Sequence, residues 1–383
     1  MVINIIISFV GAGLLGIPHA FLESGWVLGS VTLLITAGLN LYCMLLLPPV
    51  KKALIAQNHE HVHTYSDLGR CILGPTGEKI VNLCLGISQA GFATAYIIFI
   101  AANLKDMEQF QIPRSITCLL CIPGLAGLVQ FRDMKHLAPF SLLANCANAC
   151  ALTAVLFQDY EHYVPHNDTI HKVKWGGTLT VMFTTIYSME GVALILSLEA
   201  SAKNPHRFRP LLTTVIACIS SFMSIFGSAG YMAFGDATKS PITLNLEGNF
   251  SVTIVKLALC LALYLTFPIM MFPIWSMAER LVPTLQVPAK RITFRTSLVV
   301  MSALVAFLMP DFGKFLKLVG SSICTLLGFC LPTYFHLQVV PQPPAWQIML
   351  NRFLMVGGAV FGMIGTYQSF AAMMRGELES AER

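Results

Sequence analysis

The chain has 383 residues, of which 55% are hydrophobic and only 11% are charged. A soluble domain carries about twice that share of charge, and the apolar runs here recur at about 20 residues, long enough to cross a hydrocarbon core of about 30 Å. The net charge of +5 is small and gives no case for a nucleic-acid partner. The sequence therefore predicts an all-α polytopic membrane protein, a single transmembrane domain over residues 1–383, and no soluble enzyme.

The first apolar segment contains residues that break helices. Gly11, Gly13, Gly16 and Pro18 follow one another closely, and Gly costs about 1 and Pro about 3 kcal/mol relative to Ala inside a helix. Unwound backbone in a bilayer persists only where protein or a watery cavity satisfies its polar groups, so this break is a candidate binding site. Little chain precedes it, and we expect Met1 to be an internal start or a cytosolic tail to be missing.

Eleven membrane spans are predicted. They are 2–21, 26–49, 79–104, 113–130, 137–157, 175–199, 211–234, 252–275, 293–309, 314–336 and 348–374. With a cytosolic N-terminus, the cytosolic side holds thirteen Lys and Arg residues, Arg295 among them, against seven on the other side. This bias follows the positive-inside rule and predicts a C-terminus that is lumenal or extracellular. Glycosylation sequons at Asn167 and Asn249 both fall on the non-cytosolic side.

The sixth span carries Glu190 and Gly191 at its middle. A charge at that depth costs at least about 2.5 kcal/mol on insertion scales, so the Glu190 side chain should face a cavity or the interior of the bundle. One interpretation is a direct role at the site or in proton coupling. The other is a structural, neutral acid that hydrogen-bonds a neighbouring helix.

The two interrupted spans begin two halves of five spans each. The halves cover about 1–157 and 175–336, and 348–374 is an extra helix. Discontinuous helices at corresponding places in two halves indicate a secondary transporter built from inverted repeats. Their broken ends offer free N–H groups, which favour a carboxylate, and free carbonyls, which favour an ammonium or a cation.

At these residues the chain resembles the amino acid/auxin permease family, most of all its proton-coupled and plant vacuolar amino-acid transporter branches. The resemblance covers nearly the whole chain, and its specificity lies in the order and spacing of motifs that are weak singly. The matching motifs run over Val10–Pro18 with Gly25 and Trp26, Thr64–Gly69, Met189–Gly191, Leu198 and Glu199, Lys203–Pro205, Ala233–Asp236, Ile242–Asn245 and Tyr264–Pro268.

The resemblance implies a LeuT-like fold with a 5+5 inverted repeat, and import of small neutral amino acids with protons, less often with sodium. Residues implied to bind the substrate are Gly11, Ala12, Gly13 and Leu14 on the first span, Tyr187, Ser188, Glu190 and Gly191 on the sixth, and Gln89 and Tyr96 on the third. For Gln89 and Tyr96, hydrogen bonding to a neighbouring helix is the alternative. Glu190 would carry the proton; a sodium ion would lie between the Val10 carbonyl and the Thr266 hydroxyl. For Thr266, a hydroxyl bonded back to its own helix is an equal alternative.

The chain departs from the family in one respect. The proton-coupled members carry a histidine upstream of the first break, whereas here His19 follows the break. Proton coupling therefore rests on Glu190 and on the resemblance. The rivals are a sodium-coupled transporter and an amino-acid sensor that uses the same site.

No cofactor or metal is predicted, and the partners are the amino-acid substrate and the bilayer. His59–His63 fits a zinc-protease spacing, but in a polar loop it is interpreted as a solvated segment. Cys118 and Cys121 are interpreted as small buried hydrophobes. The membrane is predicted to be vacuolar, lysosomal or plasma; the sequence does not indicate the oligomeric state.

Overall fold

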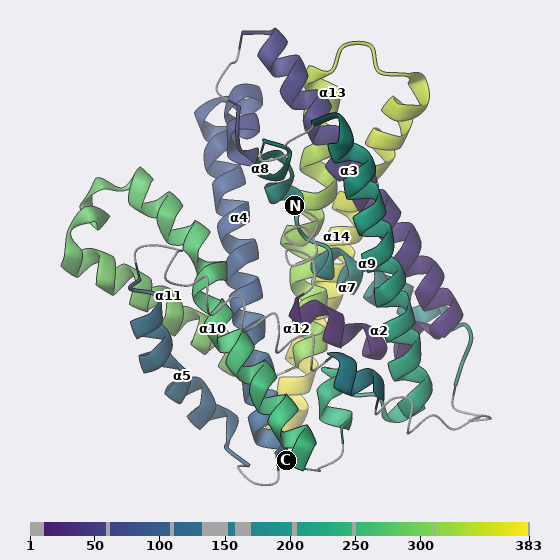
Figure 1. Cartoon of the computed structure of the whole chain (residues 1–383), viewed down its shortest axis with the longest axis vertical. Helices are drawn as coiled ribbons and strands as arrows, with labels where there is room; N and C mark the ends of the chain where they lie inside the picture. Colours follow the sequence, from purple (N-terminus) through teal and green to yellow (C-terminus); the bar gives the residue numbers. More distant parts are fainter. Residues whose placement is uncertain are drawn as a thin grey trace. The chain divides into compact units, whose positions relative to one another are not determined.

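The computed structural model describes residues 11–58, 62–107, 111–131, 152–157, 170–200, 205–246, 250–309 and 311–381. Within these ranges every regular element is a helix (Figure 1). Eight helical segments are long and apolar enough to cross a membrane, and α5 (Arg114–Leu128) is apolar but shorter. The all-helical polytopic prediction is confirmed. The count of eleven stays a prediction, because most of the span 137–157 and the start of the first span lie outside the described residues.

The chain divides into two compact units, each assembled from segments far apart in sequence. The first comprises Met1–Leu85, Lys172–Gly227 and Leu316–Arg383, and the second Gly86–His171 and Ser228–Phe315. The helices of the first unit are η1 (Ala12–Gly16), α2 (Ile17–Ser24), α3 (Trp26–Ala56), η3 (Trp175–Gly177), α7 (Thr178–Ser188), η4 (Val192–Leu194), α8 (Ile195–Ala200), η8 (Gly320–Cys324), η9 (Leu326–Cys330), α13 (Leu331–Val339) and α14 (Ala345–Ala381). Those of the second are α5, η5 (Gly235–Ala237), η6 (Ile242–Asn245), α10 (Phe250–Leu281), η7 (Pro283–Gln286) and α11 (Pro288–Leu308), while α4 (Tyr65–Asp106), α9 (Pro205–Phe234) and α12 (Phe312–Val319) have residues in both.

A sharp turn at Gly25 joins α2 to α3. Gly25 has a φ of 78°, which favours glycine, and a β-carbon there would lie 2.6 Å from the Lys172 backbone. The Lys172 carbonyl accepts the amide hydrogen of Val27 at 3.1 Å, and the Lys174 amide donates to the Ser24 carbonyl at 2.7 Å. These bonds fix the start of the sixth span against the end of the first.

The helix α4 starts well before the predicted span at 79. Thr64 and Asp67 form a capping box, in which the Asp67 carboxylate accepts the Thr64 amide at 2.8 Å and the Thr64 hydroxyl accepts the Asp67 amide at 3.2 Å. This explains part of the Thr64–Gly69 motif as a helix start. The helix then kinks at Gly74, where φ is 71°, because Pro75 disfavours helical geometry in the residue before it.

In the first unit α3 packs against α7 and α13, and α2 packs against α7. A polar chain that is buried at Asn351 and His336 links α3, α13 and α14. The Tyr42 hydroxyl donates to Asn351 Oδ1 at 2.7 Å, and Asn351 Nδ2 donates to His336 Nδ1 at 3.1 Å. Large apolar side chains of α14 such as Met349 and Tyr367 are more than 70% exposed. In a membrane this face of α14 meets lipid.

The tenth span is helical throughout but is wound more loosely at its centre. Between α12 and α13 the segments η8 and η9 are π-helical, a form that often marks functional places. The hydroxyl of Thr325, between them, donates to the Gly320 carbonyl at 2.7 Å. The apolar pattern of this span predicted a helix and gave no sign of the π-helical turns.

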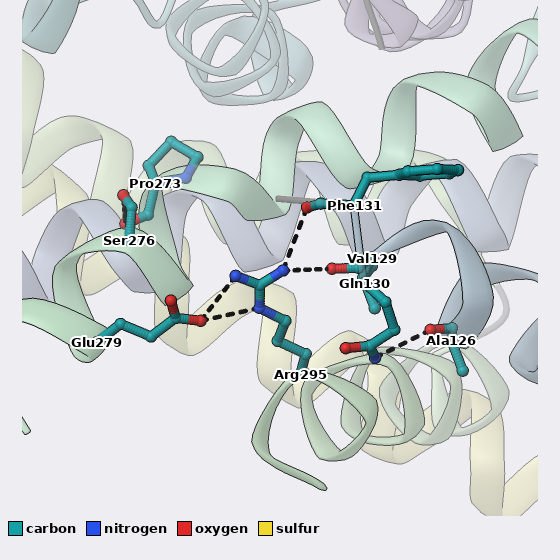
Figure 2. A network of polar contacts seen from close by, with 8 residues as sticks. All are labelled: Ala126, Val129, Gln130, Phe131, Pro273, Ser276, Glu279 and Arg295. Atoms are coloured by element: carbon teal, nitrogen blue, oxygen red, sulfur yellow. Dashed lines mark hydrogen bonds and ion pairs between the residues drawn. The ribbon is translucent and has the colours of Figure 1, made fainter. Parts of the chain in front are cut away.

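The second unit contains α5, α10 and α11, which lie together in Figure 1 and pack on one another around a buried arginine. Arg295 of α11 is 3% exposed. Its Nη2 lies 2.8 Å from Glu279 Oε1 of α10, and its Nη1 donates to the carbonyls of Val129 at 2.8 Å and Phe131 at 3.2 Å (Figure 2). The guanidinium also lies 4.7 Å from the Trp275 ring centroid. The positive-inside count treated Arg295 as a loop charge, whereas the structure buries it as a cap for the end of α5.

Candidate functional site

The first break is a stretch of non-α backbone. Gly11 is extended, with φ −128° and ψ −170°, and η1 follows it as a 3₁₀ turn that leads into α2 through Pro18. The Leu14 amide donates to the Gly11 carbonyl at 3.2 Å. The amides of Ala12 and Gly13 stand at the first positions of η1, where N–H groups lack a partner inside the helix. The backbone from Gly11 to Gly16 is therefore not α-helical, whereas the half-helix predicted before it, Val10 included, lies outside the described residues.

The second break interrupts the sixth span at the predicted residues. The α7 helix ends at Ser188, Met189 leaves helical geometry with φ −108° and ψ 20°, and the chain becomes helical again at η4. The last regular bond is from the Met189 amide to the Thr185 carbonyl at 2.9 Å. The Ser188 hydroxyl donates to the Thr184 carbonyl at 2.7 Å, a back-bond that weakens a helix end.

The two breaks meet inside the first unit. A β-carbon on Gly13 would lie 2.5 Å from Ser188 Oγ and 2.9 Å from Tyr187 Cδ1, and α7 packs on both η1 and α2. Tyr187 is 4% and Ser188 9% exposed. Sequence reasoning proposed these residues as two walls of one site, and the structure brings Gly13 directly against Tyr187 and Ser188.

Glu190 lies in the irregular segment between α7 and η4. Its Oε2 atom is out of contact with solvent and has no hydrogen-bond partner among the described residues. The Tyr65 hydroxyl of α4 is close enough to interact electrostatically with it, but donates to the Leu327 carbonyl of η9 at 2.9 Å. Within the described part of the chain Glu190 forms no ion pair.

Two neighbours of Glu190 were not anticipated from the sequence. Asn40 of α3 is 2% exposed, and its Nδ2 donates to the Met189 carbonyl at 3.1 Å. Gly328 of η9 faces both residues, since a β-carbon there would lie 3.8 Å from Glu190 Oε2 and 3.9 Å from Asn40 Oδ1. In the sequence, Asn40 is a polar residue at the centre of the apolar second span. That observation alone does not indicate a site, because the sequence does not show which residue Asn40 contacts.

The remaining predicted residues belong to the second unit. Tyr96 is 6% exposed and Gln89 is half-buried, both on α4. The Thr266 hydroxyl donates to the Ala262 carbonyl of its own helix at 2.7 Å, which is the back-bonding alternative. The sodium pair of Val10 and Thr266 therefore stays a prediction, as do the substrate contacts of Gln89 and Tyr96.

The described residues contain no group of three or more His, Cys, Asp or Glu side chains arranged to hold a metal ion. Residues 59–61 of the histidine-rich segment lie outside the described ranges. Cys118 and Cys121 are buried free thiols, in agreement with their interpretation as small buried hydrophobes.

One solved structure supports the fold. The crystal structure of the Eremococcus coleocola manganese transporter, in complex with an aromatic bis-isothiourea substituted compound, aligns with a TM-score of 0.52 over 97% of this chain and 86% of that chain, at 11% sequence identity. At that identity the likeness concerns the fold alone. It supports the predicted LeuT-like arrangement of helices.

Sequence comparisons agree over nearly the whole length of the chain. A family model described as "Transmembrane amino acid transporter protein" matches residues 1–375. Amino acid transporter AVT3B of Arabidopsis thaliana is 34% identical over 97% of this chain and 92% of that protein. Vacuolar amino acid transporter 3 of Saccharomyces cerevisiae is 29% identical over 94% and 55%, and proton-coupled amino acid transporter-like protein pathetic of Drosophila melanogaster is 25% identical over 92% and 81%. The chain belongs to the family of transmembrane amino acid transporters, and it is an integral membrane protein that transports amino acids.

Proposed function

We propose that the protein is a symporter that moves small neutral amino acids together with protons by alternating access. The observation that carries this proposal is the meeting of two non-α segments next to a carboxyl group whose Oε2 atom is buried and has no hydrogen-bond partner among the described residues. Gly13 lies against Tyr187 and Ser188, and Glu190 follows two residues later. The breaks supply backbone polar groups for an α-amino acid, and the carboxyl supplies a proton-binding group.

The substrate carboxylate would be held by the backbone at Gly11, Ala12 and Gly13, where amide groups lack partners inside a helix. The Leu14 amide is already bonded to Gly11, so Leu14 would contribute apolar packing. Tyr187, Ser188, Glu190 and Gly191 would form the opposite wall. A neutral substrate is favoured because the ionisable side chains on these two walls offer no fixed positive charge to a second carboxylate.

Glu190 is the proposed proton carrier because its cost of ionisation is high. A carboxylate in the interior of a membrane protein needs a cation or several donors, and Glu190 Oε2 has no partner among the described residues. The neutral acid is then favoured until a proton-accepting path opens. The Drosophila relative named as proton-coupled supports this choice over sodium.

Alternating access would use the division of the chain into two units. The first and sixth spans fall in the first unit, whereas most of the third and eighth fall in the second. We propose that the first unit moves as a body and opens the site to each side in turn. The yeast relative named as vacuolar supports a vacuolar membrane.

Uptake by proteoliposomes tests the function. Purified protein would be reconstituted and offered glycine, alanine, proline, glutamate and lysine, each with a pH gradient, a sodium gradient or neither. We expect neutral amino acids to accumulate with the pH gradient and to lose that accumulation when a protonophore is added. Failure of every amino acid under both gradients would exclude transport, and uptake driven only by sodium would exclude proton coupling.

The variant Glu190→Gln tests the proton carrier. The amide has nearly the same shape as the acid but cannot exchange a proton, so we expect substrate exchange at equilibrium to continue and pH-driven accumulation to be lost. Glu78→Gln on α4, whose carboxylate pairs only loosely with the exposed Arg70 at 3.7 Å, is the matched control. Normal pH-driven accumulation by Glu190→Gln would remove Glu190 from the mechanism.

A further inference from the structure

Two buried oxygen atoms beside the second break lack hydrogen-bond partners among the described residues. They are Oε2 of Glu190 and Oδ1 of Asn40. They come from different helical segments, yet both lie within 4 Å of one point, the β-carbon position of residue 328, at 3.8 and 3.9 Å. Buried polar atoms in folded proteins nearly always have a partner, so two such acceptors together need an explanation.

The Met189 carbonyl fixes which way the Asn40 amide faces. That carbonyl can only accept a hydrogen bond, so the atom of Asn40 that contacts it at 3.1 Å must be Nδ2. The Asn40 Oδ1 is then the atom that lies 3.9 Å from the β-carbon position of residue 328, the point that Glu190 Oε2 also approaches, and it can only accept. An ionised Glu190 also only accepts, and two acceptors cannot bond to each other. A proton on Glu190 Oε2 makes one of them a donor.

A metal cation explains the two oxygens less well than a proton. Hard cations such as Mg²⁺ and Ca²⁺ take about six oxygen ligands or more, and this place offers two unpaired ones. The Tyr65 hydroxyl interacts electrostatically with Glu190 but donates its hydrogen to the Leu327 carbonyl at 2.9 Å. One proton needs only the donor and the acceptor that are present.

No compensating charge for Glu190 is present among the described ion pairs. The groups that interact electrostatically with Tyr65, besides Glu190, are Cys84 of α4, Cys43 of α3 and Cys330 at the end of η9, all neutral when protonated and all buried. The nearest fixed charges on α3 and α8, Lys51 and Glu199, form their own pair at 3.7 Å.

We propose that Asn40 accepts a hydrogen bond from the protonated carboxyl group of Glu190. Because Asn40 also binds the Met189 carbonyl, protonation of Glu190 would affect the backbone conformation of the second break. The neutral carboxyl donates from Oε2 to Asn40 Oδ1, while Asn40 Nδ2 holds the Met189 carbonyl. Loss of the proton removes the first bond and leaves the bond from Asn40 Nδ2 to the Met189 carbonyl to hold the irregular segment to α3. The link between this proton and substrate movement rests on the proposed function. The proton-binding site itself does not require transport.

Infrared difference spectroscopy of the purified full chain, titrated with pH in detergent, measures the site without any substrate. The stretching band of a protonated carboxyl should appear as pH falls and should be absent in Glu190→Gln. In Asn40→Leu, which has nearly the same size, the neutral acid loses its acceptor. Its band should move to higher wavenumber, and its midpoint should fall by about one pH unit, a tenfold loss of proton affinity that matches the loss of one hydrogen bond.

Two further variants keep the proposal testable if Asn40→Leu does not fold. Asn40→Asp places a second carboxyl opposite Glu190, and the shared proton should raise the midpoint. Gly328→Ala adds a methyl group at ordinary contact distance from both oxygens and should leave the midpoint unchanged if they share the proton directly. Thr36→Val, one turn from Asn40 on α3, is the matched control and should behave as the wild type.

The proposal fails if Asn40→Leu keeps the wild-type band and midpoint, or if Glu190→Gln still shows the titrating band. A Gly328→Ala shift as large as that of Asn40→Leu would indicate a bridging water or ion and would overturn direct sharing. Direct sharing would also be overturned if the protonated-carboxyl band disappears when sodium chloride replaces choline chloride. A normal titration in a protein that transports no amino acid would leave this site intact and refute the proposed function alone.

Discussion

At the scale of single residues, the contact between the breaks depends on the absence of a side chain at Gly13. A methyl group there would lie 2.5 Å from Ser188 Oγ and 2.9 Å from Tyr187 Cδ1, closer than real β-carbons come. Because the Tyr187 ring is buried and cannot simply turn away, we expect Gly13→Ala to push the breaks apart. Amino-acid uptake by proteoliposomes should fall at least about tenfold, the effect of about 1.4 kcal/mol on the transport barrier.

Gly38→Ala is the matched control for this substitution. Gly38 lies on α3, and a β-carbon there would meet nothing within 4 Å, so its methyl group should be harmless and slightly favourable for the helix. Equal uptake by Gly13→Ala and the wild type would show that the close approach of the breaks is not needed for transport.

The sequence revealed some site residues and hid others for a physical reason. Glu190 was identifiable because a carboxyl group within an apolar span is costly whatever surrounds it. Asn40 and Gly328 were not identifiable, because an amide and a glycine are tolerated in many spans. Only their positions in the folded chain show that both lie beside Glu190. Their shared position beside Glu190 depends on three segments far apart in sequence, 40, 190 and 328, which no local pattern relates.

At the scale of elements, the arrangement of α5, α10 and α11 rests on Arg295. Its guanidinium pairs with Glu279 and satisfies the carbonyls of Val129 and Phe131 (Figure 2). Removing one partner of a buried ion pair leaves the other charge uncompensated and costs about 3–5 kcal/mol. Arg295→Met should therefore lower the thermal unfolding temperature in detergent by several degrees or more.

Two other substitutions on α11 sharpen that experiment. Lys290→Gln, at an exposed position on the same helix, should unfold at the wild-type temperature. Arg295→Lys keeps the charge but loses the planar fork that reaches the carboxylate and the carbonyls together, so it should be intermediate. An unfolding temperature for Arg295→Met equal to that of Lys290→Gln would contradict a stabilising role for the network.

Some irregularities of the helices could be predicted from neighbouring residues in the sequence, and others could not. The breaks at Gly11 and Met189–Gly191 were predictable because glycine, proline and a carboxyl group oppose a helix within a few residues. The early start of α4 was missed, although Thr64 and Asp67 carry a capping box, because polar residues before the span made the segment resemble a loop. The π-helical segment η8 packs against α7 and α14, and η9 packs against α14, whereas the apolar pattern of the tenth span is that of an ordinary helix and does not distinguish the two forms.

At the scale of the whole molecule, the number of crossings decides on which side the chain ends. The described residues contain eight candidate spans and the shorter α5; the broken first span and 137–157 would bring the predicted total to eleven, an odd number. The excess of Lys and Arg on one set of loops predicts a cytosolic N-terminus. The C-terminus, after α14, should then lie in the lumen or outside the cell.

A glycosylation tag after residue 383, expressed in eukaryotic cells, measures this directly, because only lumenal or extracellular asparagines receive glycans. We expect a shift in mass that glycosidase reverses, and no shift for the same tag placed before Met1. Glycosylation at both ends, or at neither, would mean an even number of crossings. One of the eleven predicted spans would then not cross. If that span is one of the first five, the 5+5 repeat would have to be redrawn, because the sixth span enters the membrane from the side opposite to the first only if five crossings precede it.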